Sequence, residues 1–130
     1  VTKENLDEAA AFAKAFAGKM NAVVAITGAI DIVADAEKAY CIYNGRPEMS
    51  SITGTGCQLS ALTAAFVTAN QEQPLEAAAA AVCAMGLAGE KAYARLSELD
   101  GNATYRNYII DAIYCMNGEA LEAGAKFEVR

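Results

Sequence analysis

The stretch SITGTGCQLS, residues 51–60, places two glycines and a cysteine where chemistry could occur. We interpret it as a strand, a glycine turn and the start of a helix, because a β-prone run precedes Gly54 and an apolar helical run follows Cys57. The backbone N–H groups of Thr55, Gly56 and Cys57 would then lie unpaired at a helix N-terminus, which favours an anion. The spacing matches neither common glycine-rich phosphate motif. Two interpretations therefore stay open: an anion site, or a turn that only connects a strand to a helix.

Histidine is absent from the sequence, which excludes catalytic relays of the Ser/His/Asp and Cys/His types. The four cysteines lie far apart with no CxxC pair, a spacing typical of reduced thiols rather than a disulfide framework. Cys41, Cys83 and Cys115 stand in apolar runs, so we expect them in the core. Cys57 follows the glycine turn instead. It is either a functional thiol at that turn or a structural thiol buried at a helix start.

Composition and charge indicate one folded, well-buried domain. The chain has 130 residues, of which 55% are hydrophobic, and it contains no repeat, linker or internal boundary. Its net charge of -6, with no basic block, disfavours nucleic acid and anionic membranes as partners. No apolar run approaches the roughly 20 residues of a membrane span, and the acidic first residues are unlike a signal peptide. We therefore expect a cytoplasmic protein.

The elements that must position the glycine turn are predicted by periodicity. An amphipathic helix is expected first, capped by Thr2 and ended by Gly18. Strands follow in NAVVAITG, DIVAD, KAYCIYNG and SSIT. The later helices are expected at residues 55–70, at 74–99 with Pro74 in its first turn, and from a cap at Thr104 to about 116, where Asn117 and Gly118 end it. This order indicates an α/β layer fold, and so small a sheet should expose apolar surface unless something covers it.

The order of these motifs resembles the C-terminal half of hydroxyethylthiazole kinase, a thiamine-pathway family of the ribokinase-like superfamily. The resemblance rests on ITGAID at residues 26–31, on TGTGC with the helix after it, and on GEKAYAR in the Ala-rich helix. The TGTGC block is fairly specific, because other ribokinase-like kinases usually carry Asp where this family carries Cys. The resemblance covers essentially the whole chain. It implies that residues 1–130 are the C-terminal half of one ribokinase-like domain, part of a central sheet flanked by helices.

The resemblance also implies a nucleotide contact at the ITG motif. Thr27, with Gly28 beside it, matches a position that contacts ATP. A strand-end threonine often bonds nearby backbone instead, so this second role for Thr27 stays open. Ala29 stands where the family often has an acidic residue, which leaves the role of that side chain open.

At the glycine turn, the resemblance implies that Gly54 meets the thiazole substrate through its backbone and that Cys57 stands at the catalytic position. Thr55 and Gly56 would complete the anion hole with Cys57. Backbone donors of this kind stabilise a transferring phosphoryl group. Cys57 would accept the proton of the alcohol, and the helix N-terminus would favour its thiolate form.

The implied activity is the ATP-dependent phosphorylation of 5-(2-hydroxyethyl)-4-methylthiazole, with Mg²⁺, in thiamine biosynthesis. Most of the thiazole pocket and the acidic residues that handle magnesium would belong to an N-terminal half, so no metal ligand is expected in this chain, and the chain alone should be inactive. Members of the resembled family form trimers with sites between subunits, which implies that this protein is a homo-oligomer. Two alternatives stay open: a non-catalytic module that binds a partner, and a ribokinase-like kinase of another small alcohol.

Overall fold

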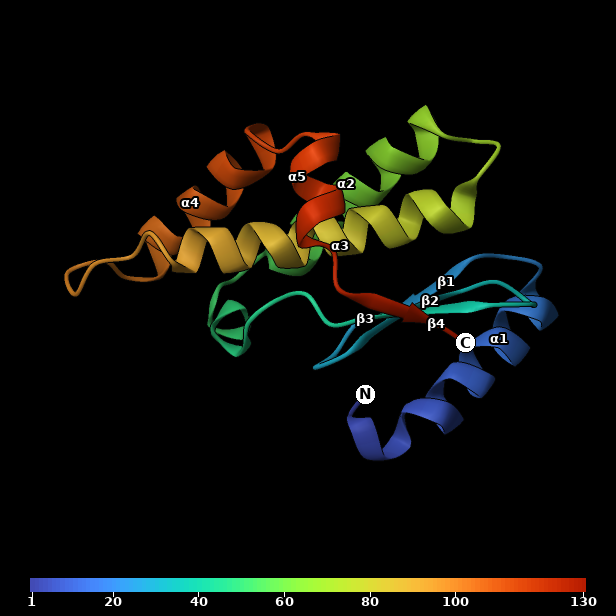
Figure 1. The fold of residues 1–130 in the computed structure, drawn as a ribbon. Helices are drawn as coiled ribbons and strands as arrows, with labels where there is room; N and C mark the ends of the chain where they lie inside the picture. The colour runs from blue at the N-terminus through green and yellow to red at the C-terminus, as the bar shows by residue number, and fades with distance from the viewer.

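The computed structural model describes all residues, 1–130, and arranges them in three layers (Figure 1). A four-stranded sheet is the middle layer, with α1 against one face and α3 against the other, and α2, α4 and α5 pack against α3. The helices are α1 (Leu6–Met20), α2 (Thr55–Ala69), α3 (Pro74–Tyr93), α4 (Asn102–Tyr114) and α5 (Gly118–Gly124), with short 3-10 helices η1 (Lys3–Asn5) and η2 (Pro47–Ser51). The strands are β1 (Val24–Ile26), β2 (Asp31–Ala34), β3 (Ala39–Ile42) and β4 (Phe127–Val129). The predicted α/β layer fold is confirmed.

The two central strands are buried on both faces. The strands run in the order β1-β2-β3-β4, and each neighbouring pair is antiparallel. Ile32 and Cys41 are register partners that face α1, whereas Val33 and Ile42 face α3. Burial on both sides explains why these strands read as nearly continuous apolar runs in the sequence.

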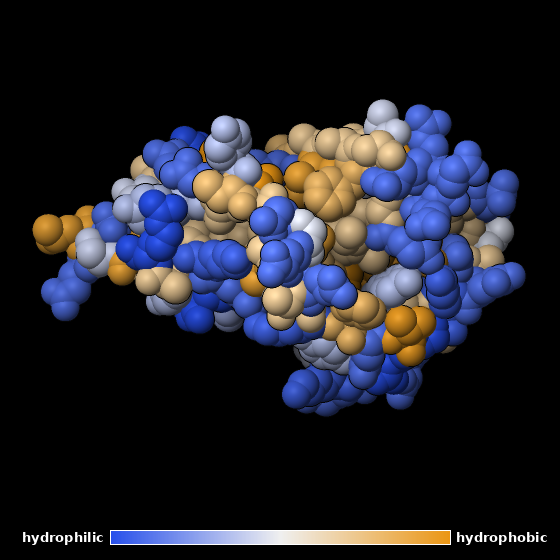
Figure 2. Space-filling view, turned by 45° about the horizontal axis from the view of Figure 1, so that its top comes forward, coloured by the Kyte–Doolittle hydropathy of each residue, from blue (hydrophilic) through white to orange (hydrophobic).

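Apolar surface is exposed at several places, as expected. Phe12, Phe16 and Met20 follow one another at helical spacing along α1 and are 62%, 42% and 56% exposed. The two phenylalanine rings stack with their centroids 6.1 Å apart. On the side of the molecule that carries the helices, Figure 2 shows further apolar atoms among hydrophilic ones. In addition, β1 pairs with β2 along one edge and has no strand along the other.

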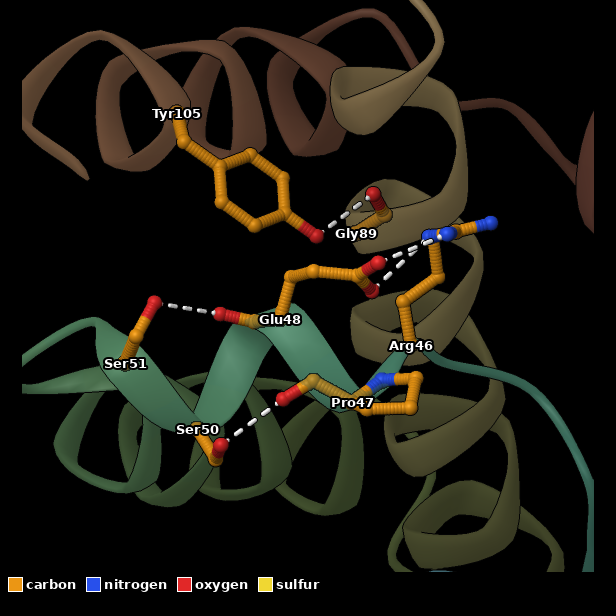
Figure 3. Close-up of polar contacts among 7 residues, drawn as sticks. All are labelled: Arg46, Pro47, Glu48, Ser50, Ser51, Gly89 and Tyr105. Atoms are coloured by element: carbon orange, nitrogen blue, oxygen red, sulfur yellow. Dashed lines mark hydrogen bonds and ion pairs between the residues drawn. The ribbon is translucent and has the colours of Figure 1, made fainter. Parts of the chain in front are cut away.

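The strand predicted in SSIT is wrong, because Pro47–Ser51 forms the 3-10 helix η2. Pro47 occupies the first helical positions, where its missing N–H is tolerated. The hydroxyls of Ser50 and Ser51 donate to the carbonyl oxygens of Pro47 and Glu48, at 2.7 Å each (Figure 3). Such local bonds to backbone compete with strand formation. Ile52, directly after η2, has extended dihedral angles.

Two predicted helix ends are also wrong. α1 continues past Gly18 to Met20 and is capped by Asn21, which has a left-handed φ of 49° and donates its N–H to the carbonyl oxygens of Ala17 and Gly18. α3 ends at Tyr93 rather than near residue 99. Beyond it, the N–H and hydroxyl of Ser97 both bond to the carboxylate of Asp100, at 2.8 and 2.9 Å, which favours a turn over helix.

The last part of the chain carries more structure than predicted. α4 begins at Asn102, after an extended Gly101, so Thr104 is not its cap. α4 ends at Tyr114, shortly before the predicted stop at Asn117 and Gly118, and Asn117 instead caps a new helix, since its side chain accepts a hydrogen bond from the N–H of Ala120 at 2.9 Å. β4 then pairs with β3 at the edge of the sheet. Cys115 is exposed just after α4, so its predicted place in the core is wrong, whereas Cys41 and Cys83 are buried as predicted.

Candidate functional site

One cavity of about 540 Å³ opens where three loops meet beside α3. The lining comes from the turn after β1, from the segment between β3 and the end of η2, from the first turns of α2, and from the middle of α3. The lining residues are Thr27, Gly28, Ala29, Asp31, Asn44, Gly45, Arg46, Pro47, Met49, Ser50, Thr55, Gly56, Leu59, Val82, Met85 and Gly86. The ITG motif and the GTGC turn, which are far apart in the sequence, therefore border the same space.

The N-terminus of α2 offers three free backbone donors. Gly54 precedes the helix with a φ of +97°, and no side chain caps the helix. The first hydrogen bond at this end runs from the N–H of Gln58 to the carbonyl oxygen of Gly54, at 3.0 Å. The N–H groups of Thr55, Gly56 and Cys57 donate to no atom of the chain. Free donors at the positive end of a 15-residue helix favour an anion at this place.

The other two residues predicted at this turn flank the cavity rather than line it. Gly54 is the residue before α2, and Cys57 lies in the first turn of the helix with its side chain exposed. The alternative of a buried structural thiol at Cys57 is therefore wrong. The thiol instead lies one residue beyond the lining residues Thr55 and Gly56.

Thr27 and Gly28 line the same cavity from the turn after β1. The hydroxyl of Thr27 is free, because it forms none of the side-chain hydrogen bonds of this structure, so the alternative of a hydroxyl bonded to backbone is not observed. The N–H of Gly28 donates to Oδ1 of Asp31 at 2.8 Å. Ala29 also lines the cavity, and its side chain brings no charge to it.

Asp31 is a candidate that sequence reasoning misses. It is the one carboxylate among the lining residues, and it fixes the ITG turn through Gly28. Burial raises the pKa of Asp31, and the hydrogen bond from Gly28 opposes that shift. The available signal is the spacing of three residues from Gly28, which is typical of a side chain bonded to its own turn. That spacing does not reveal the cavity.

Arg46 is the one positively charged residue of the lining. Its Nε and Nη2 donate to the two carboxylate oxygens of Glu48 at 3.1 and 2.8 Å (Figure 3), and its guanidinium lies 3.9 Å from the centre of the Tyr93 ring. The ion pair reduces the charge that Arg46 offers to an anion in the cavity. Sequence reasoning misses this residue, since an Arg two residues before a Glu indicates only a surface ion pair.

Metal-binding and membrane-spanning features are not found. No group of three or more acidic or cysteine side chains is arranged to hold a metal ion. None of the helices is both long enough and apolar enough to cross a membrane.

The two glycines of the turn differ in a way that allows a clean test of the anion site. A β-carbon at Gly56 would enter open space and needs no unusual φ, whereas Gly54 has its φ at +97°. We expect Gly56→Ala to keep or slightly raise the melting temperature, because alanine favours a helix by about 1 kcal/mol over glycine, and yet to weaken ATP binding by blocking the approach to the N–H groups. Gly54→Ala should lower stability by about 1–2 kcal/mol through backbone strain.

Gly118 provides the matched control, since it begins α5 and a β-carbon there also meets nothing. Gly118→Ala should therefore leave ATP binding unchanged. Thermal unfolding and calorimetric titration with ATP measure the two effects. ATP binding by Gly56→Ala that equals the wild-type value would mean that the turn only connects η2 to α2.

The fold and the site together define a layered α/β protein in which free helix N-terminal donors and a second glycine turn border one cavity, an arrangement suited to phosphate groups. The model of the hydroxyethylthiazole kinase family matches residues 2–119. This chain belongs to the hydroxyethylthiazole kinase family, as its motifs predicted.

Three relatives illustrate the match. The chain is 56% identical over 128 residues to "Hydroxyethylthiazole kinase" of Clostridium acetobutylicum, covering 98% of this chain and 47% of the relative. It is 40% identical over 118 residues to "Hydroxyethylthiazole kinase" of Zea mays, covering 91% and 41%. The solved hydroxyethylthiazole kinase structure from Pyrococcus horikoshii OT3 superimposes with a TM-score of 0.86 at 33% identity, over 98% of this chain and 48% of the other. The chain thus spans about half the length of the relatives it matches.

Proposed function

We propose that this chain belongs to an ATP-dependent kinase of 5-(2-hydroxyethyl)-4-methylthiazole, in thiamine biosynthesis, and forms the part that holds the phosphate groups of ATP. The observation that carries the proposal is the cavity that is lined both by the start of α2, with its free N–H groups, and by the turn of Thr27 and Gly28. Membership of the hydroxyethylthiazole kinase family supports the identity of the substrate.

The residues present fit the phosphates of ATP. Thr27 has a free hydroxyl and Gly28 has no side chain, so both can lie against the nucleotide. The N–H groups of Thr55, Gly56 and Cys57 would hold the phosphoryl group as charge develops on it. Gly54 would meet the thiazole through its backbone. Bound ATP supplies the phosphoryl group and leaves as ADP.

Cys57 would act as the base of this transfer. The hydroxyl oxygen of the alcohol attacks the γ-phosphorus while the bond from that phosphorus to the ADP oxygen breaks, and the hydroxyl proton passes to the thiolate of Cys57. An exposed side chain at the edge of the cavity leaves room for the alcohol beside it. Weak base assistance is enough, because the transition state of phosphoryl transfer is loose.

Magnesium does not fit the residues of this chain, because Asp31 is the one carboxylate of the lining and no acidic cluster accompanies it. We assign the magnesium ligands and most of the thiazole pocket to an N-terminal half, with which residues 1–130 would form a single kinase domain. The free edge of β1 and the exposed stripe on α1 give that half surfaces to cover. We also propose a homo-oligomer, a trimer by family resemblance, in the cytoplasm, where the free cysteines would stay reduced.

The substrate is tested by a coupled assay of ADP release on the complete enzyme, this chain together with an N-terminal half. We expect turnover with the thiazole alcohol and much slower turnover with pyrimidine and sugar alcohols. Faster turnover of one of the other alcohols would mean that the protein is a kinase of that alcohol rather than of the thiazole alcohol. ATP binding without turnover of any alcohol would favour a non-catalytic module.

A further inference from the structure

Asn44, which lines the cavity, is a buried amide side chain with 6% of its surface exposed. It follows β3 and lines the cavity beside Gly45. Its Nδ2 donates to Oε1 of Glu90 at 3.1 Å and to the carbonyl oxygen of Gly124 at 3.0 Å. Its Oδ1 accepts from the N–H of Lys126 at 2.8 Å. A buried amide with all its groups paired holds its neighbours in one arrangement.

Glu90, on α3, joins this arrangement to the turn after β3. Its Oε1 accepts from the N–H of Gly45 at 2.9 Å as well as from Asn44, and its Oε2 lies 2.8 Å from Nζ of Lys126. Burial alone would raise the pKa of Glu90, but the contacts from Lys126, Gly45 and Asn44 together lower it. The carboxylate is therefore ionised at neutral pH and accepts three donors at once.

The turn at Gly45 has little freedom to move while these bonds exist. Gly45 has a φ of +116°, and a β-carbon at Gly86 of α3 would lie 2.7 Å from Asn44. The segment from Gly45 to Pro47 forms one wall of the cavity. This wall is thus held by α3 from one side and by the connection from α5 to β4 from the other.

We propose that Asn44 and Glu90 are positioning residues that hold the Gly45 wall of the cavity in the place that the alcohol substrate requires, a role that rests on the proposed kinase function. The wall adjoins apolar lining from Met49 and Met85, which suits an aromatic ring. The opposite turn, at Thr27 and Gly28, is held by Asp31 instead and has no bond to Glu90. Loss of Glu90 should therefore affect the alcohol and not the nucleotide.

The test compares Glu90→Ala and Glu90→Gln in the complete enzyme. Alanine leaves the N–H of Gly45 and one donor of Asn44 without an acceptor, whereas glutamine keeps an oxygen for both. Glu76→Ala is the matched control, because Glu76 lies on the same helix, pairs with Lys38 at 2.7 Å and is outside the cavity lining. We expect Glu90→Ala to raise KM for the thiazole alcohol about 10-fold or more, the scale on which supporting residues act, with KM for ATP unchanged. Glu90→Gln and Glu76→Ala should stay near the wild-type values.

Amide hydrogen exchange at Gly45 provides a readout that does not depend on activity. Exchange should accelerate in Glu90→Ala and stay slow in the other two variants. An unchanged exchange rate at Gly45 in Glu90→Ala, or an equal rise of KM in Glu76→Ala, would overturn the proposal. If the wild-type enzyme phosphorylates no thiazole alcohol, the proposed function fails, while the exchange at Gly45 still decides whether Glu90 holds the wall.

Discussion

Replacing Cys57 with alanine in the complete enzyme is expected to lower kcat by about 10²-fold or more, the scale of a lost acid–base group. The expectation follows from the place of the thiol, exposed in the first turn of α2 and next to the free donors of Thr55 and Gly56. Stability should hardly change, because the side chain is exposed and forms none of the hydrogen bonds of the structure. Steady-state kinetics and thermal unfolding measure the two quantities.

Two further variants make this result specific. Cys115→Ala is the matched control, since Cys115 is also a free, exposed thiol but follows α4 and does not adjoin the free donors at the start of α2, and it should keep full turnover. Cys57→Asp should retain activity, because a carboxylate can accept the same proton and the superfamily resemblance favours it. Unchanged turnover in Cys57→Ala would contradict the assignment of Cys57 as the base of the transfer. A well-folded but inactive Cys57→Asp would mean that the thiol has another task.

The turns that border the cavity could be predicted from local sequence. Gly54 has the left-handed φ that a glycine before a helix allows, and α2 begins at Thr55 as its apolar run predicts. That the ITG motif borders the same cavity as this helix could be expected only from the family resemblance, since β2, β3 and η2 separate the two segments in the sequence. The catalytic and binding roles of Thr27, Gly54 and Cys57 stay predictions.

The features that sequence reasoning misses depend on partners far along the chain. Asn44 reads as a turn residue before Gly45, and its burial arises from Glu90 and Lys126, which are 46 and 82 positions away. β4 is only three residues long, and although Phe127 and Val129 favour a strand, so short a run is not distinctive until it pairs with β3. η2 could not be predicted for a local reason. Its serine hydroxyls bond to backbone carbonyls, and hydrophobic periodicity does not indicate such bonds.

The isolated chain of residues 1–130 is expected to be inactive and to self-associate, which is the largest effect that this account predicts. β1 has an open edge, and Phe12, Phe16 and Met20 expose apolar surface along α1. The cavity lacks a cluster of acidic side chains that could hold magnesium, and its one cation, Arg46, is paired with Glu48. Phosphoryl transfer needs more positive charge than this lining supplies.

An N-terminal half should reverse both effects by covering the apolar surfaces and completing the site. The direct measurement is a coupled assay of ADP release with the thiazole alcohol, run on the purified 130-residue chain and on the same chain mixed with the N-terminal half, beside sedimentation of both samples. We expect no turnover and self-association for the chain alone, with turnover and a defined oligomer after mixing. A monodisperse monomer of residues 1–130 that phosphorylates the thiazole alcohol by itself would contradict it.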